Sequence, residues 1–188
     1  PVLEFGELHA VAQQIPISLA GRLSLGGPQA EADLAARFGA GPLARLPELL
    51  PRGIMSDAGD RWLRRALVSG TIRGAEVALR GPLAAFPFRG TEGRFVARMP
   101  VEDAIIDYAA AWPRMEEIDF DLVFDDARLE ARVAAAMLKS ARLRETTVAL
   151  PDLSIEDYVL EISGRVDTAW DGLTSFVRDS PLKDGGAK

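Results

Sequence analysis

The amino-acid sequence predicts a mainly β (α+β) fold: a curved, largely antiparallel sheet of about seven to nine long strands with one or two short helices. Runs in which apolar and polar residues alternate cover more of the chain than runs with a helical period of about 3.6 residues. The connections between these runs are short, which favours antiparallel pairing of neighbouring strands. A length of 188 residues fits one domain, or slightly more than one.

Residues 1–40 predict a β-hairpin that ends a preceding β unit. Apolar residues occupy the odd positions from Ile17 to Leu25 and the even positions from Ala32 to Phe38. Gly26-Gly27-Pro28 lies between the two runs and is a turn signal. One face of this hairpin is therefore expected to be buried.

Residues 41–70 predict a connector made of a loop and a helix. The stretch 39–53 is rich in Pro, Gly and Leu, which favours loops with a short helical turn near 43–50. Ser56-Asp57 can cap a helix whose apolar spacing continues to Leu67, and Ser69-Gly70 ends it.

Residues 71–182 predict the main antiparallel sheet, followed by a tail at 183–188. The strands expected from alternation are 71–80, 93–99, 101–109, 117–125, 128–138, 140–150 and 158–166, with a corner at 81–88 and a last short helix at 170–178. The alternation is clearest in 117–125, where Ile118 and Phe124 share a face. A chain that begins with Pro1 is expected to be a fragment of a larger protein.

Composition argues against several classes of function. A net charge of −6 and a pI near 4.9 lack the basic surface of nucleic-acid-binding domains. With no cysteine and a single histidine, His9, the chain offers few ligands for metals and few nucleophiles. The acidic run 116–126 lies along a predicted strand and is interpreted as a solvated face rather than a calcium site. We therefore expect no catalytic residue, no cofactor, no metal and no nucleic-acid partner.

The apolar face of the predicted sheet is the feature that points to a function. Periodicity alone favours a sandwich core or a sheet covered by helices. Two observations favour an open, curved sheet that holds acyl chains. The predicted helices are too few to cover the strands, and small residues such as Ala131 and Ala135 leave room beside Phe120 and Phe124.

Four segments of the chain resemble the YhdP branch of the AsmA-like family, in the same order and at similar spacing over about residues 45 to 182. These segments are Trp62-Leu63-x-x-Ala66-Leu67-x-x-Gly70, Arg80-Gly81-Pro82-Leu83-Ala84-Ala85-Phe86-Pro87-Phe88, Asp107-Tyr108-x-x-x-Trp112-Pro113 and Phe176-x-x-x-Ser180-Pro181-Leu182.

The resemblance implies a periplasmic segment of a protein that is anchored in the inner membrane of a Gram-negative bacterium, with the anchor outside this fragment. In that family, repeated β units form a long taco-like groove lined with apolar side chains. The implied role is phospholipid transport between the inner and outer membranes, which maintains the outer-membrane barrier, and it is not enzymatic. The implied partners are phospholipid acyl chains and neighbouring β units of the same chain.

The alternative hypothesis is a structural or scaffolding β domain for protein–protein interaction in the envelope, without lipid binding. Under the first hypothesis, the groove is expected to be lined by apolar residues on one face of the sheet. They are Phe95, Ile106, Tyr108, Ile118, Phe120, Leu122, Phe124, Leu129, Val133, Met137, Leu160 and Ile162.

Overall fold

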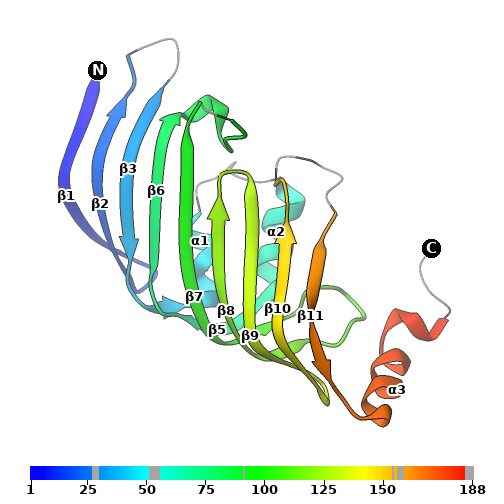
Figure 1. Cartoon of the computed structure of the whole chain (residues 1–188). Helices are drawn as coiled ribbons and strands as arrows, with labels where there is room; N and C mark the ends of the chain where they lie inside the picture. Colours follow the sequence, from blue (N-terminus) through cyan, green and yellow to red (C-terminus); the bar gives the residue numbers. More distant parts are fainter. Residues whose placement is uncertain (27–29, 51–55, 91, 154, 156–158, 185–188) are drawn as a thin grey trace.

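The computed structural model describes residues 1–188 except 27–29, 51–55, 91, 154, 156–158 and 185–188. Within the described residues the chain forms one antiparallel sheet of eleven strands, three α-helices and three 3₁₀ turns (Figure 1). The expected mainly β, antiparallel fold is confirmed. The helices are short and the sheet is open.

The strands follow one another with few crossovers. Their bounds are β1 (Val2–Ala12), β2 (Ile15–Ser24), β3 (Glu31–Phe38), β4 (Gly41–Pro42), β5 (Leu67–Ile72), β6 (Ala75–Pro82), β7 (Arg94–Ile106), β8 (Met115–Asp125), β9 (Arg128–Leu138), β10 (Ala141–Leu150) and β11 (Glu161–Asp167). The order in the sheet is β1-β2-β3-β6-β7-β8-β9-β10-β11, and β5 pairs with both β4 and β7.

The helices agree closely with the sequence prediction. Their bounds are α1 (Leu46–Leu49), α2 (Asp57–Ala66) and α3 (Trp170–Arg178), with 3₁₀ turns η1 (Leu43–Arg45), η2 (Leu83–Ala85) and η3 (Pro181–Asp184). The Ser56 hydroxyl caps α2 by accepting a hydrogen bond of 3.2 Å from the Gly59 N–H. α3 begins and ends where the spacing of its apolar residues predicts.

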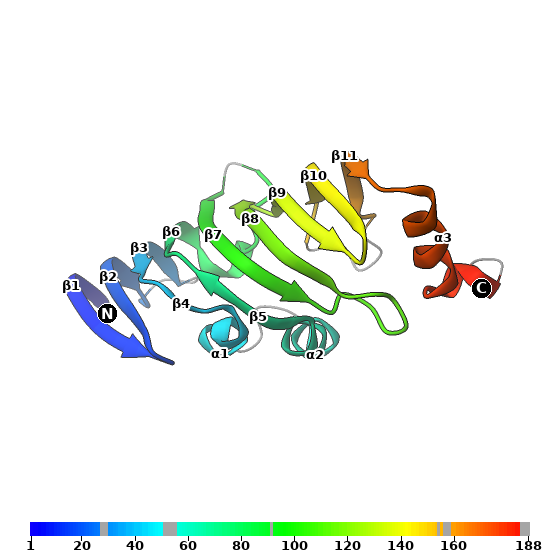
Figure 2. The ribbon, with the colours of Figure 1, turned by 90° about the horizontal axis from the view of Figure 1, so that it is seen from below.

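The sheet is curved and exposes much of its surface. Figure 2 shows α1 and α2 on one face of the sheet, and α3 beyond the β11 edge. The chain exposes 12035 Å². A compact monomer of 20.3 kDa would expose about 8,800 Å² by the usual scaling of surface with mass. This excess is expected of a single open sheet with few helices to cover it.

Strand β7 is one continuous strand, where two runs separated by Pro100 were expected. Its first half pairs with β6 from Arg94 to Arg98, and its second half pairs with β5 from Val101 onward. Pro100 has no N–H to donate, and it lies where β7 changes neighbours. Its carbonyl accepts a 3.0 Å hydrogen bond from the Arg73 N–H. The strand can therefore pass through proline.

The strand expected at 71–80 is divided into β5 and β6 at Arg73-Gly74. Gly74 has a φ of +138°, a conformation that favours glycine. β1 was not expected from the sequence, and it extends the sheet beyond the predicted hairpin β2–β3. The predicted strand 158–166 begins at Glu161 in the structure. Tyr158 and the turn residues Gly27 and Pro28 lie outside the described residues.

β-Bulges on neighbouring strands shift which residues of each strand point to the apolar face of the sheet. Asp103 on β7, Glu117 on β8 and Glu145 on β10 have φ values of 50°, 51° and 47°. The register of pairing shifts beside each of them. Residues that share the apolar face are therefore three positions apart across the bulges, as Val101 and Ala104 are. Strict alternation would place them two apart.

The buried core lies where η1 and α1 cover the ends of β5, β7 and β8. We call this the helix-covered core, and its buried residues are Ile15, Leu43, Ile72, Met99, Val101, Ala104, Ile118, Val133 and Ala136. Leu43 is 1% exposed and is joined by Leu46 and Leu49 at the margin of the cluster. Gly70 lies beneath Leu43: a Cβ there would come within 2.9 Å of the Ala104 Cα and 3.2 Å of the Leu43 Cδ2.

We predict that Leu43→Ala destabilises the fold, whereas Leu83→Ala does so much less. Both leucines open a 3₁₀ turn in a Gly-Pro-Leu-Ala segment, 41–44 and 81–84, but Leu83 is 39% exposed. Leu43→Ala should lower the free energy of unfolding by about 3 kcal/mol because it leaves a cavity. Leu83→Ala should cost less than about 1 kcal/mol. Urea unfolding of the chain measures both, and equal losses would contradict the assignment of Leu43 to the core.

Candidate functional site

The candidate site is the apolar face of the sheet, which is built by residues that lie directly opposite each other on neighbouring strands. Residues paired in this way share a face. We call the set that crosses β1, β2, β3, β6, β7, β8, β9 and β10 in direct register the upper row. Its members are Leu8, Leu19, Ala36, Val77, Ala97, Phe124, Leu129 and Leu150.

A second set, the middle row, lies two residues further along each strand. On β1 to β6 its members are Ala10, Ile17, Phe38 and Ala75, and on β7 to β11 they are Met99, Leu122, Ala131, Val148 and Ile162. Neither row contains a charged residue. Most of these side chains are partly exposed, and exposure is greatest toward the edges, with 49% at Leu8 and 64% at Ile162. On β7 both rows are buried, at Ala97 and at Met99, which also belongs to the helix-covered core.

An aromatic cluster covers the face beyond the upper row, at the end of the strands where η2 lies. The Phe86 and Phe95 rings are 5.1 Å apart in an edge-to-face contact, and the Phe95 and Phe124 rings are 6.0 Å apart. Phe88 is fully buried, and a Cβ added to Gly93 would meet its ring at 2.4 Å. The glycine thus lets the segment after η2 fold down onto the sheet.

The turn between β8 and β9 holds Phe95 in place. A carboxylate oxygen of Asp126 accepts a 2.7 Å hydrogen bond from the Phe95 N–H, and the Asp126 N–H donates to the Phe95 carbonyl at 2.8 Å. Asp126 has a φ of 53°, which Asp and Asn adopt more readily than most residues. The other carboxylate oxygen accepts from the Arg94 guanidinium at 2.6 Å.

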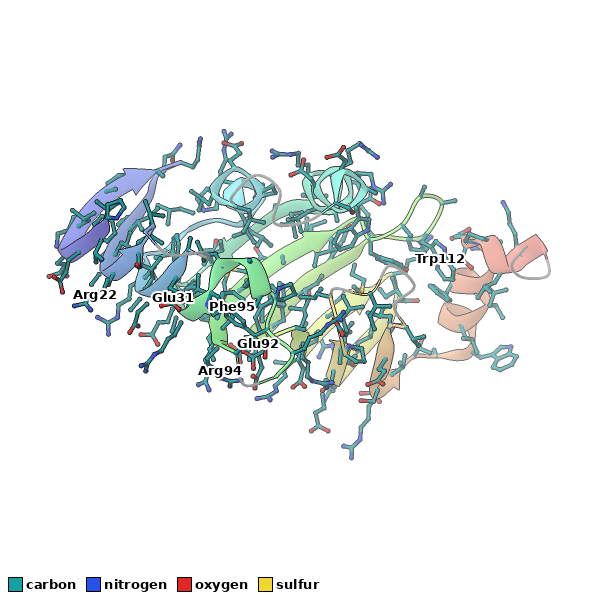
Figure 3. The ribbon with its side chains drawn as sticks, turned by 90° about the horizontal axis from the view of Figure 1, so that it is seen from above. Arg22, Glu31, Glu92, Arg94, Phe95 and Trp112 are labelled. Carbon is teal, nitrogen blue, oxygen red and sulfur yellow. The ribbon has the colours of Figure 1, made fainter. Side chains whose placement is uncertain are left out.

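The opposite face of the sheet is charged. Figure 3 shows Arg22, Glu31 and Arg94 on the side of the sheet away from α1 and α2. Ion pairs between strands join Arg22 to Glu4 at 3.0 Å and Arg37 to Glu76 at 3.5 Å. These groups are exposed, so each pair stabilises the fold little. Their main effect is to keep this face in water.

The acidic residues of β8 belong to this charged face, as expected. Asp121 lies opposite Arg132 and Pro100. On the neighbouring strand, hydrogen bonds from Arg132 and Arg128 hold the pKa of the Glu130 carboxyl below its ordinary value. Among the residues that the structure describes, no group of three or more His, Cys, Asp or Glu side chains is arranged to hold a metal ion.

The structure brings many of the predicted groove residues onto one face. Phe120 lies directly opposite Val133: Val133 belongs to the helix-covered core, and Phe120 packs against it. Leu122, Phe124, Leu129 and Ile162 belong to the two rows, and Phe95 belongs to the aromatic cluster. Leu160 precedes β11 and is 47% exposed.

Four other predicted residues lie elsewhere. Ile118 is 1% exposed in the helix-covered core, and Ile106 packs against that core. Met137 lies opposite Glu116 and Arg142, which places it on the charged face because the bulges shift the alternation after Val133. Tyr108 is in the loop after β7, where it packs against Trp112, and burial raises the pKa of its hydroxyl.

The first four strands of the face were missing from the predicted site. Leu19, Ala36 and Val77 are in direct register with the predicted residue Phe124 through Ala97. The alternation of 17–25 and 32–38 indicates apolar faces for these strands, but alternation does not show that they join the sheet that carries Phe124. Only the pairing of β3 with β6 establishes that connection.

Comparison with known protein families shows which family this chain belongs to. The model of the YhdP protein family matches residues 2–188. The chain belongs to the YhdP family. Within that family, it is 23% identical over 134 residues to the "Intermembrane phospholipid transporter YhdP" of Escherichia coli (strain K12). The alignment covers 71% of this chain and 10% of that YhdP protein, so the chain spans a small part of that relative's length.

No solved structure matches this YhdP-family chain. Among its described residues, no helix is both long enough and apolar enough to cross a membrane.

We predict that Asp126→Ala destabilises the end of the apolar face that carries Phe95. Alanine removes the acceptor for the Phe95 N–H and takes up the positive φ less readily, so the free energy of unfolding should fall by about 2 kcal/mol. Asp126→Asn keeps both an acceptor oxygen and tolerance of that backbone, and should lose less than about 1 kcal/mol. Urea unfolding measures both. Equal losses would show that the hydrogen bond does not hold the turn.

Proposed function

We propose that this chain forms one length of a groove through which a larger YhdP-family protein transports phospholipid between the inner and outer membranes. The acyl chains contact the apolar face, mainly the upper and middle rows. The observation that carries the proposal is the continuity of these rows from one edge strand toward the other without a charged side chain. The name of the E. coli relative supports phospholipid as the cargo.

An uncharged, partly exposed face suits acyl chains energetically. Removing a methylene group from water is worth roughly 0.8 kcal/mol, so even a few seated carbons give a useful gain. A charged group on such a face would have no partner on an acyl chain and would be costly to desolvate. The charged residues lie on the other face, where water solvates them. This separation lets lipid tails and water contact opposite sides of one sheet.

The larger protein is proposed to be anchored in the inner membrane and to extend through the periplasm of a Gram-negative bacterium. The open edges support a place within a longer sheet. Among the described strands, β1 and β11 each pair on one side alone, and exposed apolar residues lie on both. An exposed edge of this kind pairs readily with another strand. The proposed partners at these edges are the neighbouring β units of the same protein.

Photocrosslinking in the full-length protein tests whether lipid contacts this face. A photoreactive amino acid is placed at Leu122 in one variant and at Val123 in the other, and adducts are identified by mass spectrometry after irradiation of cells. Val123 is the matched control: it is apolar and adjacent, but it lies opposite Arg98 and Glu130 on the charged face. We expect phospholipid adducts at Leu122, severalfold more than at Val123.

Other outcomes would favour the scaffolding alternative. Protein adducts at Leu122 without lipid adducts would indicate that a protein partner covers the apolar face. Equal lipid labelling at Leu122 and Val123 would indicate non-specific contact. Either result would contradict the proposed groove.

A further inference from the structure

Three of the four segments that carry the family resemblance meet at one place in the fold. The indole N–H of Trp62 on α2 donates a 2.8 Å hydrogen bond to the carbonyl of Tyr108, in the loop between β7 and β8. The ring centroids of Tyr108 and Trp112 in this loop are 6.3 Å apart. The ring of Phe176 on α3 lies 5.8 Å from that of Trp112. We call these four residues the aromatic bridge, because they connect α2 to α3.

The turn between β9 and β10 contacts α3 as well. Lys139 in this turn forms an ion pair with Asp179, at the end of the helix. In the first turn of the helix, a Cβ added to Gly172 would come within 2.7 Å of the Ser140 Oγ. Figure 3 shows Trp112 beside α3. Contacts at both ends of α3 therefore fix its position against the rest of the chain.

Another side of α3 exposes large apolar residues. Trp170, Leu173 and Val177 are spaced i, i+3 and i+7, which places them along one side of a helix. Their exposed fractions are 79%, 44% and 38%. We call these three residues the α3 stripe. Single exposed apolar residues are ordinary on a protein surface, whereas a continuous group of them indicates an interaction surface.

We propose that the α3 stripe docks onto the β unit that follows this chain in the same protein, so that the aromatic bridge sets the position of one unit relative to the next. This inference rests on the proposed function, which places neighbouring β units at the sheet edges, and it adds a contact that joins them. The E. coli relative has ample length for such units, because the alignment covers 10% of it. α3 lies beyond the β11 edge (Figure 2), so a unit paired with β11 would lie close to the helix.

Two earlier segments of the chain show how a Pro-Leu turn covers a sheet. The turn η1 covers it through Leu43, which is buried in the helix-covered core, and η2 does so through Phe86 and Phe88, which follow it. The turn η3 begins with the same pair, Pro181-Leu182. It lies with α3 beyond the sheet (Figure 1), and Leu182 is 42% exposed. A following unit would supply the sheet surface for this third turn.

The charges of α3 argue against a membrane surface as the occupant. Helices that lie in the interface of a membrane are typically rich in Lys and Arg on their polar side. Within Trp170–Arg178 the basic residue is Arg178 alone, and Asp171 balances it. The contacts of the aromatic bridge also hold the stripe at a fixed place beside β11. A partner in a fixed position, such as the next unit of the same protein, suits such a surface.

Photocrosslinking in the full-length protein tests the docking. A photoreactive amino acid replaces Val177 in one variant and Arg178 in the other, and linked peptides are identified by mass spectrometry. Arg178 is the matched control, because it is the next residue of the same helix and is exposed outside the stripe. We expect links from position 177 to the part of the same chain that follows residue 188, severalfold more than from position 178.

Substitutions at Trp112 test the aromatic bridge. Trp112→Ala removes the ring between Tyr108 and Phe176, so the links from position 177 should fall threefold or more. Trp112→Phe keeps an aromatic ring there and should retain most of them. Lipid adducts at Leu122 should persist in both variants, which separates a displaced helix from an unfolded chain. If Trp112→Ala does not accumulate, the comparison of positions 177 and 178 still decides the docking, because it leaves the bridge intact.

The outcomes separate this inference from the proposed function. Links from position 177 to another protein or to lipid, equal links from both positions, or no links would overturn the docking and leave the groove in place. Equal links in the two Trp112 variants would overturn the role of the aromatic bridge. Links from position 177 without lipid adducts at Leu122 would instead contradict lipid transport and leave the docking in place.

Discussion

Direct antiparallel pairing between strands is the constraint on which the rest of this structure depends. Opposed residues share a face, so one apolar face continues from β1 to β10 only because every register agrees. A slip of one residue in any strand would bring charged groups such as Arg132 and Asp121 onto that face. The bulges also satisfy this constraint. They lie at corresponding positions on neighbouring strands, so all of these strands shift their alternation together and the apolar face continues past the bulges.

The helices of this chain are too few to cover one whole face of the sheet. Within the part of the chain that the structure describes, the covered regions are the two ends of the central strands. Val101 and Ile118 are buried at the end that η1 and α1 cover, and Phe88, in the segment after η2, is buried at the other end. Both covering segments are connections that the strand order requires. η1, α1 and α2 lie between β4 and β5, and η2 lies between β6 and β7. Cover at these ends is therefore a consequence of topology, and among the described residues most of the face between them stays partly exposed.

The sequence predicts much of the candidate face where alternation is regular. Phe120 and Val133 were expected to share a face, and they lie directly opposite each other. Met137 is predicted to lie on the apolar face, and this prediction was wrong. A bulge between Val133 and Ala136 shifts the alternation, so Met137 lies on the charged face. Ile118 has the expected face, but alternation cannot reveal that η1 and α1 cover it. Leu19 and Ala36 fall outside the predicted groove because the sequence assigns residues 1–40 to the end of a preceding β unit.

Local chemistry by itself determined most of the strands, the helices and the separation of charge from apolar surface. Alternation encodes which side chains share a face, and Ser56 sets the start of α2 through its own hydroxyl. The tertiary structure decided which strands are neighbours, where the bulges fall and which part of the apolar face is covered. β7 shows the reason: the proline at its centre is compatible with a strand only because β6 gives way to β5 beside it. The change of neighbour from β6 to β5 depends on residues far from Pro100 in the sequence, so no local sequence pattern can predict it.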